Sequence, residues 1–158
     1  MRSPGSGIPV SVRVQRDAFD EAAEKAALVG GRFDVGAVVA FTGYCRDEGG
    51  RLEALELEHY PGMAEAEILR IAQEAAARWP LLGVSVVHRF GKIQPGEGIV
   101  LVLASSAHRG AAFAGADFVM DFLKSRAPFW KKEHGRNGAA GDWVAAKDED
   151  EASLARWS

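Results

Sequence analysis

The sequence predicts an α+β sandwich in which three main helices pack on a mostly antiparallel sheet. Two observations lead to this fold class: helical and strand patterns interleave along the chain, and two pairs of strands are joined by short turns rather than by helical crossovers. The 158 residues suffice for one domain, over 1–158, with a sizeable core. A composition that is 47% hydrophobic and 26% charged excludes a disordered or fibrous protein.

Hydrophobic periodicity and turn residues predict four elements in the first sixty residues. Alternating or β-branched apolar runs predict strands, apolar residues at helical spacing predict a helix, and glycine pairs predict the breaks. These elements are an edge strand over 9–14, a helix over 18–29 between its N-cap Asp17 and its stop at Gly30, and strands over 36–44 and 52–59 on either side of the turn Gly49-Gly50.

The same signals predict the elements of the remaining chain. They are a helix over 63–79 ended by Pro80, strands over 84–90 and 99–105 joined at Gln94-Pro95-Gly96, a helix over 109–124, an extended piece over 129–133, a glycine-rich loop over 135–141 and a last strand over 143–146. The strand over 99–105 is almost wholly apolar, so we expect it to be central. In the helix over 109–124, one apolar face holds Phe113, Ala116, Met120 and Leu123, while Asp117 and Asp121 are expected to face solvent.

The chain ends and the cysteine and histidine content predict a cytoplasmic protein without a metal site. No stretch suits a signal peptide or a membrane span, and segments 1–8 and 148–158 are expected to be flexible. The single cysteine, Cys45, is expected to be a small strand residue rather than a nucleophile. The four histidines lack metal-ligand spacing, so no metal is expected, and His59 and His88 are expected to be hydrogen-bonded strand residues. The glycines match neither a Walker loop nor a dinucleotide-binding motif, so no other cofactor is expected.

Charge is distributed unevenly, which indicates an anion-binding region. Residues 105–136 hold six lysines and arginines against three acids. His108 and Arg109 lie where an apolar strand gives way to a helix, and backbone N–H groups at a helix start bind anions. Lys124 and Lys131 bracket a proline-aromatic corner that could hold both amines partly buried, where desolvation or neighbouring cations would lower a lysine's pKa. A solvated basic surface is the alternative left open by composition.

Arg109 and Lys124 stand at opposite ends of one predicted helix. At 1.5 Å per residue they are about 22 Å apart, so one small ligand cannot contact both within a chain. Either they serve different sites, or a symmetric dimer brings Arg109 of one subunit beside Lys124 of the other. We predict the dimer.

Five segments, in order over about residues 36–147, together resemble a known family. They are GAVVAFTGYCRD, LELEHYPGMAE, RWPLLGVSVVHRFG, PGEGIVLVLASSAHRGAAF and MDFLKSRAPFWKKE, and they resemble the large, catalytic subunit of molybdopterin synthase, the MoaE family. The resemblance implies an α/β-hammerhead-like, two-layer sandwich and a central homodimer with a small ubiquitin-like sulfur carrier bound at each end. It implies that the carrier's C-terminal Gly-Gly thiocarboxylate donates sulfur to cyclic pyranopterin monophosphate, in two transfers that create the dithiolene of molybdopterin.

The resemblance also implies site residues. Lys124 and Lys131 match the family's essential lysines, with Lys124 nearest the sulfur-bearing carboxyl terminus. The residues that match its pterin and phosphate pocket are Arg46, His108, Arg109, Lys132 and Glu133, with Phe41 and Met120 as lining, although residue type alone would place Phe41 and Met120 in the core. The chain departs from the family pattern in having no arginine before Trp143 and in having Lys147 where arginine is usual, which replaces a bidentate contact by a point charge.

Two other functions remain open from the sequence. A chain that keeps the anion pocket but has lost turnover would be a binding module, which the presence of both lysines disfavours. An RNA-binding surface is poorly supported, because no aromatic stacking platform interleaves with the basic residues.

Overall fold

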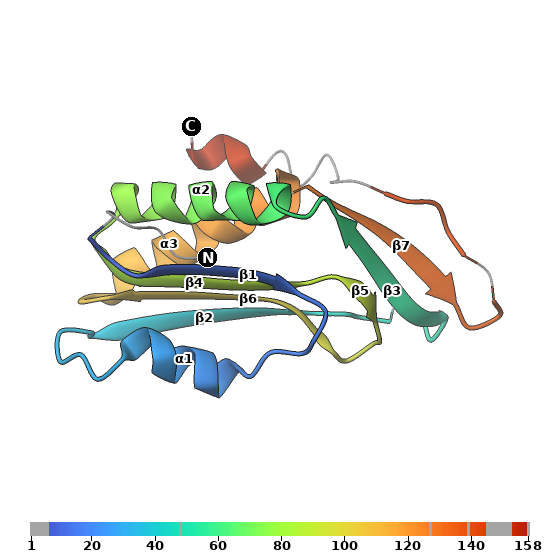
Figure 1. Ribbon diagram of the computed structural model, residues 1–158, viewed down its shortest axis with the longest axis horizontal. Coiled ribbons are helices and arrows are strands. Elements are labelled where there is room, and N and C mark those ends of the chain that lie inside the picture. Colours follow the sequence, from blue (N-terminus) through green and yellow to red (C-terminus); the bar gives the residue numbers. More distant parts are fainter. Residues whose placement is uncertain (1–6, 48, 127, 139, 145–152, 158) are drawn as a thin grey trace.

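The structure is a computed structural model that describes residues 7–47, 49–126, 128–138, 140–144 and 153–157. Its strands form a four-stranded sheet and a three-stranded sheet (Figure 1). The first has the order β1 (Val10–Gln15), β4 (Leu81–Arg89), β6 (Gly98–Ser106) and β2 (Ala37–Tyr44), and the second has the order β5 (Gly91–Ile93), β3 (Leu52–His59) and β7 (Phe129–Gly135). Among the described strands only β1 and β4 pair in parallel, so the predicted α+β fold with mostly antiparallel pairing is confirmed.

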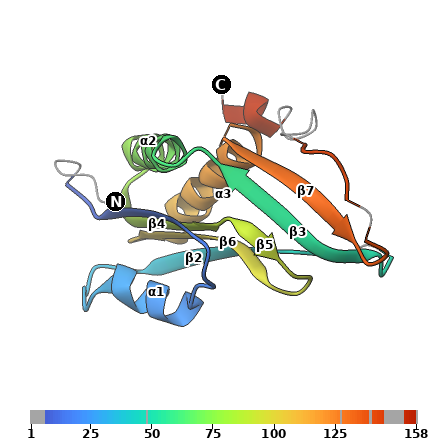
Figure 2. The same cartoon turned by 45° about the vertical axis from the view of Figure 1, so that its right-hand side comes forward.

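Three helices cover the four-stranded sheet, as predicted. They are α1 (Glu21–Val29), α2 (Met63–Arg78) and α3 (Arg109–Ser125). Figure 1 and Figure 2 show α2 and α3 on one face of this sheet and α1 on the other, while the three-stranded sheet extends from one end. The ends of α3 and β7 therefore meet beside the junction of the two sheets.

β6 lies between β4 and β2, which confirms the predicted central strand. Its side chains alternate between two cores. Val102 and Ala104 pack with residues of α2 and α3, whereas Leu101 and Leu103 pack on the other face, with Leu28 of α1 beside them. A strand that is buried on both faces must be apolar throughout, which explains the unbroken hydrophobic run.

α1 begins later than predicted. Its N-cap is Asp20, whose side chain accepts a hydrogen bond from the backbone N–H of Ala23 at 3.1 Å, so the prediction of Asp17 as N-cap is wrong. The reason is Phe19, which precedes the helix and packs over Gly98 at the start of β6, where any side chain would collide with its ring. The predicted stop is confirmed, since Gly30 has the left-handed backbone (φ 58°) that favours glycine.

The strands on either side of Gly49-Gly50 exist, but they do not pair with each other. β2 pairs with β6, and β3 pairs with β5 and β7, so the expected strand pair across this turn is wrong. The chain leaves β2 through an irregularity in register at Tyr44, and the backbone of Cys45 then bonds to Gly96 and Glu97. Sequence periodicity locates each strand but does not specify its partner.

The remaining elements agree with prediction except for β5, the length of β7 and the last strand. The predicted helices over 63–79 and 109–124 are α2 and α3, and the predicted strands over 84–90 and 99–105 are β4 and β6. β5 was not predicted, and the extended piece over 129–133 is the longer strand β7. Of the predicted strand over 143–146, the structure shows one bridge, between Val144 and Lys131, while residues 145 and 146 and also Lys147 lie outside the described residues.

A stack of aromatic rings joins the two sheets. Phe129, the first residue of β7, lies opposite His59 of β3. Its ring stacks on His88 of β4, with centroids 3.8 Å apart and an interplanar angle of 15°, and on His59 at 5.8 Å. Because His88 belongs to one sheet and Phe129 to the other, this contact fixes the two sheets against each other.

The two histidines of the stack differ in hydrogen bonding. Nδ1 of His88 donates to the carbonyl oxygen of Arg89 at 2.8 Å, which confirms the expectation for this residue. Nδ1 of His59 is buried without a hydrogen-bond partner in the described structure, and its Nε2 lies 4.0 Å from a carboxylate oxygen of Glu65, so the same expectation is wrong for Nδ1 of His59. Burial lowers the pKa of His88 to about 4, and the neighbouring charges of His59 and Lys124 act in the same direction.

The end of the chain packs on the helices, although the sequence leads us to expect flexibility over 148–158. Within its described part, η1 (Ala155–Trp157) is a turn of 3₁₀ helix, and Leu154 before it is buried. The ring of Trp157 meets Trp79 and Phe118 edge to face, at 5.5 Å from each. This packing adds an aromatic layer over α2 and α3.

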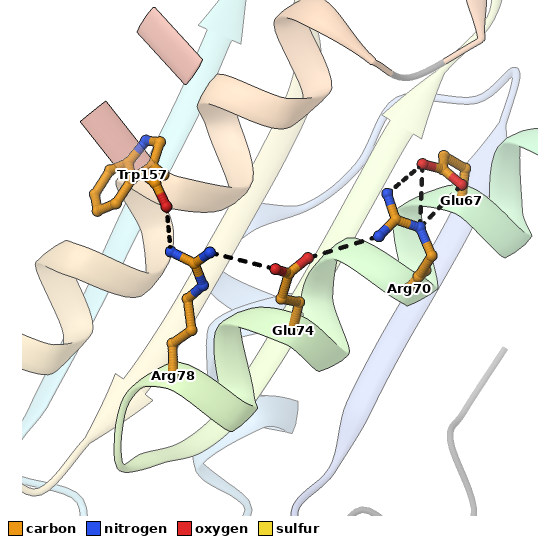
Figure 3. Close-up of polar contacts among 5 residues, drawn as sticks. All are labelled: Glu67, Arg70, Glu74, Arg78 and Trp157. Carbon is orange, nitrogen blue, oxygen red and sulfur yellow. Dashed lines mark hydrogen bonds and ion pairs between the residues drawn. The ribbon is translucent and has the colours of Figure 1, made fainter. Parts of the chain in front are cut away.

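Polar contacts hold the same segment from both helices. Arg156 pairs with Asp117 and Asp121 of α3, the two acids that were expected to face solvent, and Trp157 Nε1 also donates to Asp121. From α2, Arg78 donates to the carbonyl oxygen of Trp157 at 2.8 Å. Figure 3 shows that Arg78 is the last member of a row of alternating charges formed by Glu67, Arg70, Glu74 and Arg78.

Trp157→Ala should lower the free energy of unfolding by about 2 kcal/mol, because it removes an aromatic side chain packed on two others. Urea denaturation followed by circular dichroism measures this loss. Phe33→Ala is the control, since the Phe33 side chain is fully exposed, and it should change the free energy of unfolding by less than about 0.5 kcal/mol. Equal losses in the two variants would contradict the packing role of Trp157.

The low pKa of His88 makes stability depend on pH. Between the folded value of about 4 and the ordinary value of 6.5, the unfolded chain binds a proton that the folded chain does not, so stability is lost as the pH falls through this range. Compared with His88→Phe, which cannot ionise, the wild-type protein should lose about 2 kcal/mol more between about pH 7 and pH 4.5. Urea denaturation at both pH values tests this, and parallel losses in the two proteins would contradict it.

Candidate active site

α3 carries candidate site residues at both ends. The helix begins after His108 and continues unbroken through Ser125. Arg109 and Lys124 are therefore separated by about 22 Å along the axis, at 1.5 Å per residue. The separation expected from the sequence is confirmed, and the two cations cannot share a small ligand within one chain.

The start of α3 is fixed by the segment that leads into β2. The backbone N–H of Gly36 donates to the carbonyl oxygen of Ser106 at 3.0 Å, and a side chain at position 36 would collide with the carbonyl of Ala107. Glycine is therefore required there for the close approach of the two segments. His108 and Arg109 are both exposed beside the N–H groups of the first helical turn, an arrangement suited to an anion.

The other end of α3 and the start of β7 form a corner that carries both lysines. We call Lys124, Phe129 and Lys131 the two-lysine corner. Lys131 is half-buried, as expected, whereas Lys124 is exposed, so the expectation of partial burial is wrong for Lys124. The corner adjoins the ring stack, because Phe129 is stacked on His88 and the charge of Lys124 reaches the same imidazole.

The backbone of Lys131 is held on both sides. Across the β3–β7 ladder it lies opposite Leu57. On its other side, its N–H donates to the carbonyl oxygen of Val144 at 3.0 Å, and the N–H of Val144 donates back at 2.8 Å. These contacts fix where the Lys131 side chain leaves the sheet.

Neighbouring residues of β7 point to opposite faces of the three-stranded sheet. Lys131 and Glu133 share the face of Leu57, which is buried in a core cluster with Cys45. Lys132 projects from the other face, where its Nζ lies 5.3 Å from the centroid of the Trp143 ring. The structure thus separates Lys132 from the lysine that precedes it.

Cys45 is a buried strand-end residue and not an activated nucleophile, as expected. Its Sγ lies 3.7 Å from the carbonyl oxygen of Ile93. Burial raises the pKa of the thiol, and nearby carboxylates, including that of Glu133, act in the same direction. Arg46 follows Cys45 directly and is exposed.

The apolar candidates divide between core and surface. Met120 is buried in α3 among core residues, in line with its residue type. Phe41 is 40% exposed on β2, so the core assignment from residue type is wrong for it. Phe113, predicted to share the apolar face of α3, is 60% exposed, whereas Ala116 and Leu123 on that face are buried.

A cavity of about 690 Å³ opens on the outer face of the three-stranded sheet, away from the two-lysine corner. Its walls are formed by Arg16, Glu56, Glu58, Phe90, Gly91, Lys92 and Trp143. The carboxylates of Glu56 and Glu58 balance the positive charges of Arg16 and Lys92. The cavity is therefore less suited to an anion than the two ends of α3, which carry basic residues. No sequence pattern marks it, because its walls come from separate segments of the chain.

Sequence reasoning also missed the ring stack beside the corner. Each of its three rings comes from a different strand, and no spacing along the chain brings His59, His88 and Phe129 together. In the part of the chain that the structure describes, no helix is long and apolar enough to cross a membrane, and no group of three or more potential metal-ligating side chains occurs.

Comparison with known proteins gives consistent matches along the chain. The family model described as "MoaE protein" matches residues 14–126. The chain is 67% identical over 147 residues to the molybdopterin synthase catalytic subunit of Mesorhizobium japonicum, covering 93% of this chain and 92% of that protein. It is 63% identical to the subunit of the same name from Rhizobium meliloti, covering 95% and 97%.

Solved structures agree with these matches. The molybdopterin biosynthesis MoaE protein of Burkholderia ambifaria superposes with a TM-score of 0.82 at 48% identity, covering 94% of this chain and 97% of that one. The similarity therefore includes the three-stranded sheet and the helices that carry the candidate site. The chain belongs to the MoaE family.

Proposed function

We propose that this chain is the catalytic subunit of a cytoplasmic molybdopterin synthase. In this role it transfers sulfur from the C-terminal thiocarboxylate of a small ubiquitin-like carrier to cyclic pyranopterin monophosphate. The similarity to proteins named as catalytic subunits supports the activity, and a catalytic subunit implies a second kind of subunit. The two-lysine corner is the observation that assigns this activity to particular residues. There the exposed Lys124 and the half-buried Lys131 lie on either side of one turn of the chain.

The corner suits the chemistry of an anionic carrier tail. A lysine about 4 Å from one negative charge contributes on the order of 4 kcal/mol at an effective dielectric constant of 20, before desolvation costs. The carrier sulfur first displaces an oxygen leaving group from a substrate carbon, so a carbon–sulfur bond forms as a carbon–oxygen bond breaks, and the carrier is then joined to the substrate as a thioester. Water attacks the carbonyl carbon of this thioester. The amines of Lys124 and Lys131 stabilise the oxyanion, the carbonyl carbon–sulfur bond breaks, and sulfur remains on the substrate while the carrier leaves as a carboxylate.

The anion site at the start of α3 is too far from Lys124 of its own chain to act on the same substrate. It can take part in this reaction only if it meets Lys124 of a second chain. We infer a symmetric dimer in which His108 and Arg109 of one subunit bind the substrate phosphate beside Lys124 of the other. The open edge of β2 supports this arrangement: none of its eight residues is buried in the described chain, although its sequence is largely apolar. Phe41 on this strand and Phe113 on α3 are both exposed, and an open apolar edge is normally covered.

Lys124→Ala and Lys131→Ala should each lower the rate of sulfur transfer at least about 100-fold, because each removes a charge that stabilises the oxyanion. The assay combines the purified protein, thiocarboxylated carrier and cyclic pyranopterin monophosphate, and detects the dithiolene pterin by mass spectrometry. Lys25→Ala is the control, since Lys25 is exposed on α1. An inactive wild-type protein that still binds the substrate would instead indicate a binding module without turnover.

Phe113→Asp should convert the dimer to a monomer, because it places a charge in the proposed apolar interface. Sedimentation velocity measures the change as a halving of the particle mass. Tyr60→Asp is the matched control: Tyr60 is 58% exposed but lies beyond β3, away from β2. A dimeric Phe113→Asp variant or a monomeric wild-type protein would contradict the proposed interface.

A further inference from the structure

His88 adjoins the two-lysine corner but has no part in the transfer described above. It is 8% exposed, and its ring lies face to face with Phe129 at 3.8 Å and 15°. Phe129 also contacts His59, its partner across the β3–β7 ladder. Rings from two other strands therefore fix the first residue of β7.

Phe129 is the part of the corner that links the two lysines. It precedes Lys131 by two residues on the same face of β7 and follows Lys124 by five. Lys124 is held by α3, so a shift of Phe129 moves Lys131 relative to it. A shift of the Phe129 ring would consequently change the distance between the backbone positions that carry the two amines.

The hydrogen bonding and surroundings of His88 suit a fixed, neutral ring. Its Nδ1–H donates to the carbonyl oxygen of Arg89, which orients the imidazole plane. A second proton would place a cation near Lys124 of α3 and His59 of β3. The neighbouring guanidinium of Arg89 is directed elsewhere, to the carbonyl oxygens of Arg16 and Gly98.

We propose that His88 is a positioning residue, which through its stack on Phe129 fixes the separation of Lys124 and Lys131. This inference deepens the proposed function and rests on it for the catalytic importance of the two amines. A histidine that only fills the core would affect stability and leave the corner of the folded protein unchanged. The two roles therefore differ in what they predict for the lysines themselves.

Three variants separate the ring stack from packing in general. His88→Phe keeps a stacked ring, His88→Gln removes it while retaining a hydrogen-bond donor, and Phe129→Leu removes it from the other side. Partial acetylation with acetic anhydride, read by mass spectrometry, reports the reactivity of each amine. We expect the Lys131 rate relative to Lys25 to rise at least threefold in His88→Gln and Phe129→Leu, and to stay within twofold of wild type in His88→Phe.

Steady-state kinetics give a second readout of the same variants. His88→Gln should lower kcat at least tenfold and leave KM for the carrier within twofold, because misplaced amines weaken stabilisation of the transition state in particular. His88→Phe should keep a kcat within twofold of wild type. A variant that is merely less stable, assayed well below its melting temperature, would keep both constants.

The proposal is overturned by wild-type acetylation ratios in both His88→Gln and Phe129→Leu, or by a His88→Phe variant as altered as His88→Gln. Acetylation needs no turnover, so it is independent of the proposed reaction. If the acetylation ratios change as expected while the wild-type protein transfers no sulfur, the proposed function fails and the positioning role of His88 stands.

Discussion

The stacked rings of His88 and Phe129 are the contact on which the geometry of the site depends. The two sheets of this protein share no ladder among the described strands, and the chain passes between them through short segments, as from β4 to β5, and through the helices α2 and α3. The direct connection from β4 to β5 holds one edge of the smaller sheet, and the face-to-face contact at 3.8 Å between His88 of β4 and Phe129 of β7 holds the other edge. Since β7 carries Lys131 and α3, which rests on the larger sheet, carries Lys124, the same contact positions Lys131 relative to Lys124.

α3 imposes the second constraint, because a straight helix cannot bring its own ends together. The cations at its start lie beside the segment entering β2, and Lys124 at its end lies beside the junction of the sheets. Each chain thus holds two separate groups of cations. The open edge of β2 and the exposed Phe113 lie on the surface that could bring such groups together across two chains.

The sequence was sufficient for features that depend on local signals. Gly30 ends α1, because the left-handed backbone conformation there favours glycine. An apolar run identifies β6, because a strand that is buried on both faces is apolar throughout. Both ends of α3 were likewise predicted to within one residue. Its length, and with it the separation of Arg109 and Lys124, followed without knowledge of the tertiary structure.

Features that depend on tertiary contacts could not be predicted from the sequence. Asp17 and Asp20 are equally good caps locally, and the choice between them is made by Phe19 packing over Gly98. The pattern around Gly49-Gly50 fits a hairpin of β2 and β3. Instead, β2 pairs with β6 and β3 pairs with β7.

The structure bears on the arrangement of the candidate residues, which the sequence could not supply. Family resemblance grouped Lys131 and Lys132 in one site, whereas the pleat of β7 directs them to opposite faces of the sheet. The ring stack could not be predicted at all, since it requires the relative orientation of three strands.

The pairing of Val144 with Lys131 has a consequence for how a peptide can approach this lysine. Both backbone hydrogen-bonding groups of Lys131 that face away from β3 are already occupied by the chain's own Val144. An extended tail from another protein cannot add a strand to β7 at this position while that pairing holds, because strand addition requires an unpaired edge. Recognition of such a tail at Lys131 then depends on the ammonium group and not on the main chain, which makes it responsive to the charge of the tail and tolerant of its sequence.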